Sequence, residues 1–137
     1  MTAKEVVKQF YDLDFAKDDT VLDLIHPNCE LNWNSSKGYT CLDYKGIQEK
    51  IADIRETYFT FNYKLSHLLE DNNTVTARYT IYGTPIEKDG EDNNQEAIAH
   101  FISIWEVKDG KLYRGYEISQ LLDDKAENIS TFSEINI

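Results

Sequence analysis

Alternating apolar and polar residues run through the second half of the chain and predict four long strands. Residues 61–69 and 74–84 alternate over their whole length, with turn-forming residues between them at 71–73. The longest run, residues 100–122, is divided by Asp109-Gly110, a pair typical of tight hairpin turns because glycine accepts a positive φ. The strand before that turn is apolar on both faces, so a layer should cover each face. We expect the chain's own helices on one face and a second subunit on the other, and hence a homodimer.

The first 60 residues carry a helical spacing of apolar positions instead. The first helix should run over residues 2–17, with a capping box at its start and two neighbouring apolar rows. A second, short helix follows and should end at His26, because the next residue is a proline. Residues 46–58 form the third predicted helix, and a short hairpin over residues 30–44 precedes it. Three helices followed by long antiparallel strands predict an α+β fold.

The composition fits one globular domain with an acidic surface. With 137 residues and 41% hydrophobic content, the chain is long enough to form a core without disulfides or metals. Its net charge of −11 argues against nucleic acid or an anionic membrane as a partner, because both attract clustered Lys and Arg. No apolar run approaches the roughly 18 residues of a membrane span. The start of the chain lacks the basic and apolar regions of a signal peptide, so we expect a cytoplasmic protein.

Neither cysteine pairing nor a cofactor is indicated. Cys29 and Cys41 are too few for a zinc site, and across the predicted hairpin Cys29 falls opposite about Tyr44, so we expect both thiols to be reduced. The sequence has no phosphate-binding glycine loop, metal-ligand cluster or GxSxG nucleophile motif. We therefore expect no metal and no cofactor.

Two segments lack the regular apolar spacing of packed elements. Residues 85–94 are acidic without an apolar anchor, and we expect a mobile loop there. Residues 123–137 are polar with scattered apolar positions, and we expect order only if this segment docks on the rest. The predicted domain therefore covers residues 1–122, and a C-terminal tail covers residues 123–137.

Four short stretches, in this order and spacing, resemble the nuclear transport factor 2-like fold and, within it, the SnoaL-like group. They are Leu24-Ile25-His26-Pro27, Tyr44-Lys45-Gly46-Ile47, Tyr82-Gly83-Thr84 and residues 105–112. The resemblance spans residues 1 to about 122. It implies a cone-shaped, curved antiparallel sheet wrapped around three N-terminal helices, with an internal cavity and a dimer formed through the outer sheet face. Members of this fold isomerise, cyclise, hydrate or only bind small molecules, so the resemblance does not select one reaction.

Strand parity places one ionisable residue among the candidates for the inner face of the last two strands. These candidates are Phe101, Ser103, Trp105, Tyr113, Gly115, Glu117 and Ser119. A carboxylate in an apolar cavity has its charged form disfavoured, so its pKa should rise toward a range useful for acid–base catalysis. The alternative is that twist or a bulge turns Glu117 to solvent, or that a Lys or Arg pairs with it.

Trp33, Tyr79 and Trp105 should also line the cavity, although inner-face aromatic residues are often only core. Ketosteroid isomerases share this fold and use a tyrosine and a protonated acid as hydrogen-bond donors, together with a carboxylate base. The resemblance aligns Phe10 with the tyrosine, Trp33 with the base and Ser103 with the acid. None of these three side chains can replace the group it aligns with, so ketosteroid isomerase activity is not expected. The paired carboxylates of the limonene epoxide hydrolases are also missing, because Phe101 and Ser103 occupy the strand on which they would be expected. SnoaL-type cyclases, which need a single acid–base carboxylate, stay open.

The histidines have structural explanations as well as catalytic ones. His67 and His100 resemble the histidine pair of the dehydratases of this fold. His67 shares its parity with Leu65 and Leu69 and is expected in the core, whereas His100 shares that of Ile102 and is expected at the subunit contact.

Two functions therefore remain. The first is a module that binds a small apolar or partly polar molecule in its cavity without catalysis, which the sparse polar lining favours. The second is a cofactor-independent lyase, isomerase or polyketide-cyclase-like enzyme that uses Glu117 as its acid–base group. A second polar side chain within hydrogen-bond reach of Glu117 would favour the enzyme.

Overall fold

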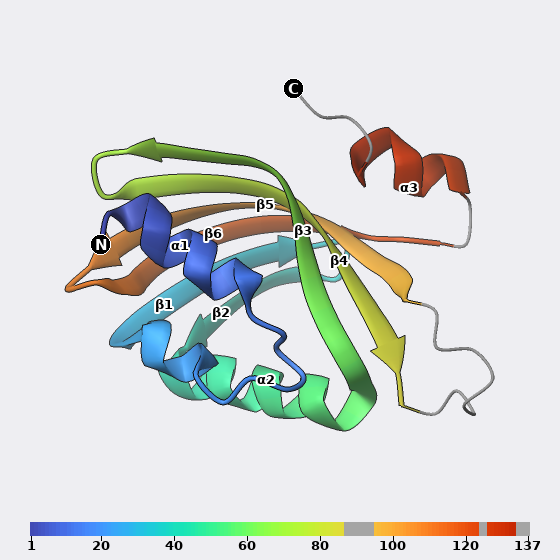
Figure 1. The fold of residues 1–137 in the computed structure, drawn as a ribbon, viewed down its shortest axis with the longest axis horizontal. Helices are drawn as coiled ribbons and strands as arrows, with labels where there is room; N and C mark the ends of the chain where they lie inside the picture. Colours follow the sequence, from blue (N-terminus) through green and yellow to red (C-terminus); the bar gives the residue numbers. More distant parts are fainter. Residues whose placement is uncertain (87–94, 124–125, 134–137) are drawn as a thin grey trace.

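A curved sheet of six strands forms the body of the protein in the computed structural model, which describes residues 1–86, 95–123 and 126–133 (Figure 1). Its order is β2-β1-β6-β5-β4-β3, and every neighbouring pair is antiparallel except β1 and β6. The elements are α1 (Ala3–Asp12), a 3₁₀ helix η1 (Val21–Leu24), β1 (Ile25–Ser35), β2 (Gly38–Asp43), α2 (Tyr44–Thr57), β3 (Tyr58–Asp71), β4 (Thr74–Pro85), β5 (Glu96–Lys108), β6 (Lys111–Leu121) and α3 (Ala126–Ser133). The predicted α+β class with a curved sheet is confirmed.

Helix α1 begins as predicted but ends five residues before the predicted Lys17. The Thr2 hydroxyl accepts a hydrogen bond from the Glu5 amide and caps the first turn. Asp14 ends the helical run, because its Oδ1 accepts hydrogen bonds from the amides of Ala16 and, on β3, Phe61. These bonds tie the chain after α1 to the sheet instead of continuing the helix.

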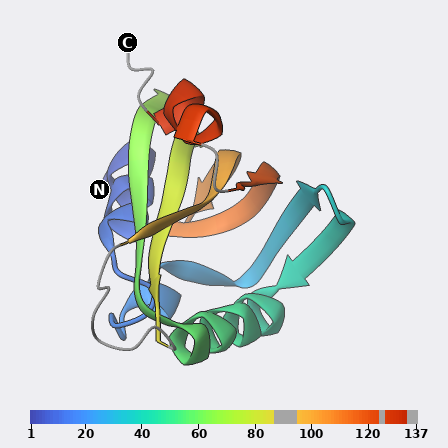
Figure 2. The same ribbon diagram turned by 90° about the vertical axis from the view of Figure 1, so that its right-hand side faces the viewer.

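The second predicted helix is only the 3₁₀ turn η1, and His26 and Pro27 belong to β1 rather than to a helix end. The third predicted helix is α2, which begins two residues earlier than expected. Its N-cap is Asp43, whose Oδ1 accepts a hydrogen bond from the Gly46 amide at 2.8 Å. Helix α2 spans the distance between the two edge strands, β2 and β3 (Figure 2).

The inner face of the sheet carries the predicted alternation on β4 and β5, and α1 packs across it (Figure 1). All of the inward residues at its centre are buried: Val75, Ala77, Tyr79, Ile81, Phe101, Ser103 and Trp105. Gly115 on β6 makes room for the Trp105 ring, because a Cβ at this position would lie 2.6 Å from that ring. At the β5–β6 turn, Asp109 and Gly110 both have positive φ, as the predicted tight hairpin requires.

Two of the β-bulges in the sheet change the facing of residues that were predicted for the core or the cavity. On β3 the pairing passes from Leu65, opposite Tyr79, to His67, opposite Arg78, so one residue is inserted. His67 and Leu69 therefore turn away from the inner face, and the expectation of a core position for His67 is wrong. Its Nδ1 lies 2.9 Å from the Ser66 hydroxyl on the same strand. The second bulge, on β6, concerns the cavity and is described below.

Helix α3 docks on the outer face of the sheet. His100 Nε2 lies 2.9 Å from the Asn128 carbonyl oxygen, and the His100 ring stacks on Phe132 with 4.2 Å between centroids. The Arg78 guanidinium lies 3.7 Å from the centre of the same Phe132 ring. His100 is thus buried under its own chain's helix α3. Most of the predicted acidic loop, residues 87–94, lies outside the described residues.

Candidate functional site

Helices α1 and α2 and the inner face of the sheet enclose a cavity of about 330 Å³, a size at the lower end of ligand pockets. Most of its lining is aromatic or aliphatic. Lys50 and Asp53, which are exposed residues of α2, line its solvent-side part, and Glu117 lines it from β6.

Three nearly parallel rings form one wall of the cavity. The rings of Tyr79 and Phe101 are stacked at 5.4 Å with an interplanar angle of 5°. Trp33 continues the row, at 6.2 Å and 24° from Phe101. The Trp33 ring is held by a hydrogen bond from its Nε1 to the Ser119 hydroxyl at 2.8 Å. A wall of this shape suits a flat apolar ligand.

The half-buried Glu117 side chain is anchored through one of its two carboxylate oxygens. Ser103, directly opposite on β5, donates a hydrogen bond to Oε1 at 3.1 Å, and the Tyr79 hydroxyl donates to the same oxygen at 3.3 Å. Among the described residues, Oε2 accepts no hydrogen bond, whereas every fully buried side-chain N or O atom has a partner. Oε2 is therefore an accessible atom that a ligand in the cavity can reach.

Burial raises the pKa of Glu117 to about 7, while the hydrogen bonds from Ser103 and Tyr79 lower it. Phenols from three other elements interact electrostatically with Glu117, namely those of Tyr11 on α1, Tyr63 on β3 and Tyr79 on β4. Burial raises the pKa of all three phenols, so they are neutral near pH 7. Glu117 can consequently either accept or donate a proton under physiological conditions.

A buried row of hydrogen bonds extends behind Glu117. Ser103 Oγ and the Tyr79 hydroxyl are 2.7 Å apart. The Tyr11 hydroxyl donates to Tyr79 at 3.2 Å, and the Trp105 indole Nε1 donates to Tyr11 at 2.8 Å. Tyr11, Tyr79 and Trp105 are each at most 2% exposed, so water does not compete for these bonds.

Comparison with known families establishes the relationship of the protein. The sequence profile of the SnoaL-like domain matches residues 7–115, which is most of the chain. The chain belongs to the SnoaL-like family. Comparison of the sequence with curated proteins gives no match.

Solved structures share the fold of this SnoaL-like protein at low sequence identity. IdmH from Streptomyces antibioticus, described as a putative polyketide cyclase, is 17% identical with a TM-score of 0.69, over 87% of this chain and 92% of that one. An NTF2-like protein from Burkholderia thailandensis is 16% identical with a TM-score of 0.64, over 87% and 91%. A putative isomerase from Rhodopseudomonas palustris is 9% identical with a TM-score of 0.65, over 95% of each chain. These likenesses show the NTF2-like fold.

The structure of the SnoaL-like protein brings most of the predicted site residues together. Six of the nine line the cavity, namely Phe10, Trp33, Tyr79, Phe101, Trp105 and Glu117. Ser103 and Ser119 are next to it and bond to lining residues, Ser103 to Glu117 and Ser119 to Trp33. These two serines orient the lining and are not part of it.

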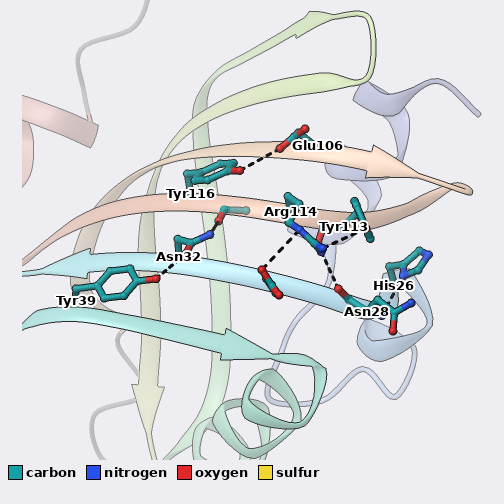
Figure 3. Close-up of polar contacts among 10 residues, drawn as sticks. His26, Asn28, Asn32, Tyr39, Glu106, Tyr113, Arg114 and Tyr116 are labelled. Carbon is teal, nitrogen blue, oxygen red and sulfur yellow. Dashed lines mark hydrogen bonds and ion pairs between the residues drawn. The ribbon is translucent and has the colours of Figure 1, made fainter.

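Tyr113 is the exception, and its predicted place in the cavity is corrected. The pairing of β5 with β6 passes from Glu106 opposite Arg114 to Val107 opposite Leu112, so Tyr113 is the extra residue of a β-bulge. Leu112 takes the buried position that alternation assigns to Tyr113. Tyr113 instead lies beside Arg114, whose guanidinium is 3.9 Å from the Tyr113 ring centre, and packs against His26 (Figure 3).

Two tyrosines of the site were not predicted from the sequence as site residues. Tyr11 belongs to an apolar row of α1, and Tyr63 to the inner face of β3, and both line the cavity. A signal for Tyr11 does exist, because a tyrosine in the buried stripe of a helix needs a partner for its hydroxyl. Which partner it finds depends on the distance between α1 and β4, which sequence spacing does not give.

Two further features concern metal ions and membranes in the part of the chain that the structure describes. In residues 1–86, 95–123 and 126–133, no three His, Cys, Asp or Glu side chains gather closely enough to hold a metal ion. None of the helices in these ranges has the length and apolar character needed to cross a membrane.

Proposed function

We propose that the protein binds a small, largely apolar molecule in its cavity and that Glu117 exchanges a proton with this molecule. The observation that carries the proposal is the Glu117 carboxylate, with Oε1 held by Ser103 and Tyr79 and Oε2 open to a largely apolar cavity. Two polar side chains within hydrogen-bond reach of Glu117 favour the enzyme over the binding module. The reaction would be a cofactor-independent proton transfer of the lyase, isomerase or cyclase type.

The aromatic wall and Glu117 would have different roles in this reaction. The wall of Tyr79, Phe101 and Trp33 would orient the flat apolar part of the ligand. Glu117, with a pKa near 7, would take a proton from an acidic C–H or O–H group and return it at another atom. Because the proton is returned, no redox partner or cofactor is needed. The descriptions of IdmH as a putative polyketide cyclase and of the Rhodopseudomonas palustris protein as a putative isomerase agree with this class of chemistry.

Binding without catalysis is the second candidate, favoured by the small number of polar groups in the lining. One experiment separates the two. A thermal-shift screen of small apolar ketones and phenols would first identify ligands, since a ligand at 100 times its dissociation constant stabilises by about 2.7 kcal/mol. Exchange of the acidic C–H hydrogens of each bound ketone would then be followed in D₂O by NMR.

We expect wild-type protein to accelerate this exchange and Glu117→Gln to bind the same ligand without accelerating it. Leu13→Ala, a change outside the cavity lining, serves as the matched control and should exchange at the wild-type rate. Binding with no accelerated exchange in the wild type would leave only the binding module. No stabilising ligand at all would contradict both candidates.

We further propose that the protein is a cytoplasmic homodimer. Cys29 and Cys41 are free thiols, as expected for a reducing compartment. On the outer face, Ile102 pairs with Ile118 and Ile104 with Tyr116, and all four are exposed in the single chain. A second copy covering this patch would bury it.

A further inference from the structure

We propose that Trp105 and Tyr11 are positioning residues that direct the proton of Glu117 to Oε2, the oxygen that faces the cavity. The inference rests on the proposed acid–base role of Glu117 and specifies which of its oxygens meets the ligand. It follows from the direction in which each hydrogen bond of the buried row runs.

Trp105, at the far end of the row, fixes which group donates and which accepts in each hydrogen bond. An indole N–H donates and cannot accept, so the Tyr11 oxygen must be the acceptor in the 2.8 Å contact between them. The Tyr11 proton is then directed to the Tyr79 oxygen, 3.2 Å away. Tyr79, having accepted this bond, directs its own proton onward to Ser103 or Glu117. Because Tyr11, Tyr79 and Trp105 are buried, reversing the bond between the two tyrosines would leave the Tyr11 hydroxyl proton without an acceptor.

The row ends in three oxygens, which belong to Tyr79, Ser103 and Glu117. The Tyr79 and Ser103 hydroxyl oxygens are 2.7 Å apart, and Glu117 Oε1 lies 3.1 Å from Ser103 and 3.3 Å from Tyr79. Tyr79 and Ser103 each bring one proton, and only the carboxylate oxygen brings none. Oε1 therefore accepts hydrogen bonds in both protonation states and takes the role of the carbonyl oxygen when Glu117 is protonated. The added proton goes to Oε2, which accepts no bond from the described residues.

This arrangement defines the group that the ligand presents. Protonated Glu117 offers an O–H donor to the cavity, which a carbonyl, ether or hydroxyl oxygen can accept. Deprotonated Glu117 offers Oε2 as a base, while Oε1 stays occupied by the hydrogen bond from Ser103, alone or together with the one from Tyr79. The ligand is therefore an apolar molecule with an oxygen acceptor placed against Oε2, and protonation at that oxygen is the step that the site assists.

Infrared spectroscopy of the ligand-free protein tests the inference, so the result does not depend on turnover or on finding a ligand. Between pH 5 and 6 Glu117 is protonated, and subtracting the spectrum of Glu117→Gln isolates its C=O stretch. A carbonyl that accepts hydrogen bonds absorbs at a lower wavenumber than a free one, because the bonds weaken the C=O bond. We expect a single low band in the wild type.

In Tyr11→Phe, Tyr79 loses the bond that it accepts and becomes free to accept from Ser103 or from Glu117. We expect a second band at higher wavenumber, from the fraction of Glu117 whose proton has moved to Oε1 and whose free carbonyl faces the cavity. Tyr63→Phe is the matched control, because Tyr63 packs 5.0 Å from Tyr11 and makes no hydrogen bond to a described residue. Its band should stay at the wild-type position.

Ser103 gives a second, milder pair of variants in case Tyr11→Phe does not fold. Ser103→Ala removes one donor to Oε1 and should shift the band upward, whereas Ser103→Thr keeps the hydroxyl and should restore it. A wild-type band at the free-carbonyl position would overturn the inference, as would a Tyr11→Phe spectrum identical to the wild type. If the wild type shows a single low band but does not accelerate exchange in D₂O, the proposed reaction is refuted. The placement of the Glu117 proton on Oε2 would still stand.

Discussion

At the scale of single residues, the chemistry of Glu117 depends on what surrounds each of its oxygens. Alternation along β6 predicted its inward position, and apolar surroundings predicted the raised pKa. The sequence did not predict the two donors to Oε1, because Tyr79 and Ser103 were assigned from parity only to the same face. Whether they reach Glu117 depends on the register of β4, β5 and β6, which an alternating pattern leaves open.

The stability of Glu117→Gln relative to the wild type should rise with pH. The pKa of Glu117 is raised from 4.5 to about 7, so between these values the native state binds more protons than the unfolded chain. Wild-type protein therefore loses stability as pH rises through this window, by up to roughly 3 kcal/mol, while the neutral amide escapes the loss. Melting temperatures of both proteins from pH 4 to pH 8 measure this difference.

Glu56→Gln on the exposed surface of α2 is the control, and its melting curve should run parallel to that of the wild type. If the curve of Glu117→Gln is also parallel to that of the wild type, the Glu117 carboxylate is solvated. Glu117 would then not be the acid–base group that we propose.

At the scale of elements, the alternating patterns predicted the long strands and the β5–β6 turn well. They failed at the bulges, because an inserted residue breaks the alternation, so that the residues on its two sides no longer follow one common parity. Tyr113 and His67 were misplaced for this reason. Helix α1 was predicted too long because nothing in the spacing of apolar residues shows that Asp14 will bond to β3.

Docking of α3 on the outer face should contribute measurably to stability. Phe132 stacks on His100 and lies under the Arg78 guanidinium, so Phe132→Ala should reduce the free energy of unfolding by about 1–2 kcal/mol. Urea denaturation would measure the loss. Thr131→Ala is the control on the same helix, because among the described residues its exposed side chain bonds only to the Asn128 carbonyl. Equal stability of the two variants would mean that α3 does not dock in solution.

At the scale of the whole molecule, the outer face of the sheet has two distinct parts. Helix α3 covers the end that carries His100, whereas Ile102 and Ile104 are each 40% exposed and Ile118 is 62% exposed. The sequence predicted a covered outer face because β5 is apolar on both sides. It did not predict that the chain's own C-terminal helix would supply part of that cover.

The exposed part should be the contact between two copies of the chain. We expect wild-type protein to sediment as a dimer at micromolar concentration and Ile102→Asp to sediment as a monomer, because the charge would be buried in a dry contact. Phe59→Asp changes an equally apolar, exposed residue at the start of β3 and should stay dimeric. A monomeric wild type would refute the dimer.

The position of β6 between β1 and β5 has a consequence for how the protein folds. Among the described residues, β6 is the last strand in sequence order, yet it alone joins the β1–β2 hairpin to the β3–β4–β5 part of the sheet (Figure 1). The two parts cannot unite until β6 is added, and its pairing with β1 closes a loop of more than 80 residues, as between Glu30 and Arg114. Contacts so distant in sequence form slowly, so this step should limit the folding rate. Since β6 also carries Glu117, the cavity acquires its walls and its carboxylate in the same late event.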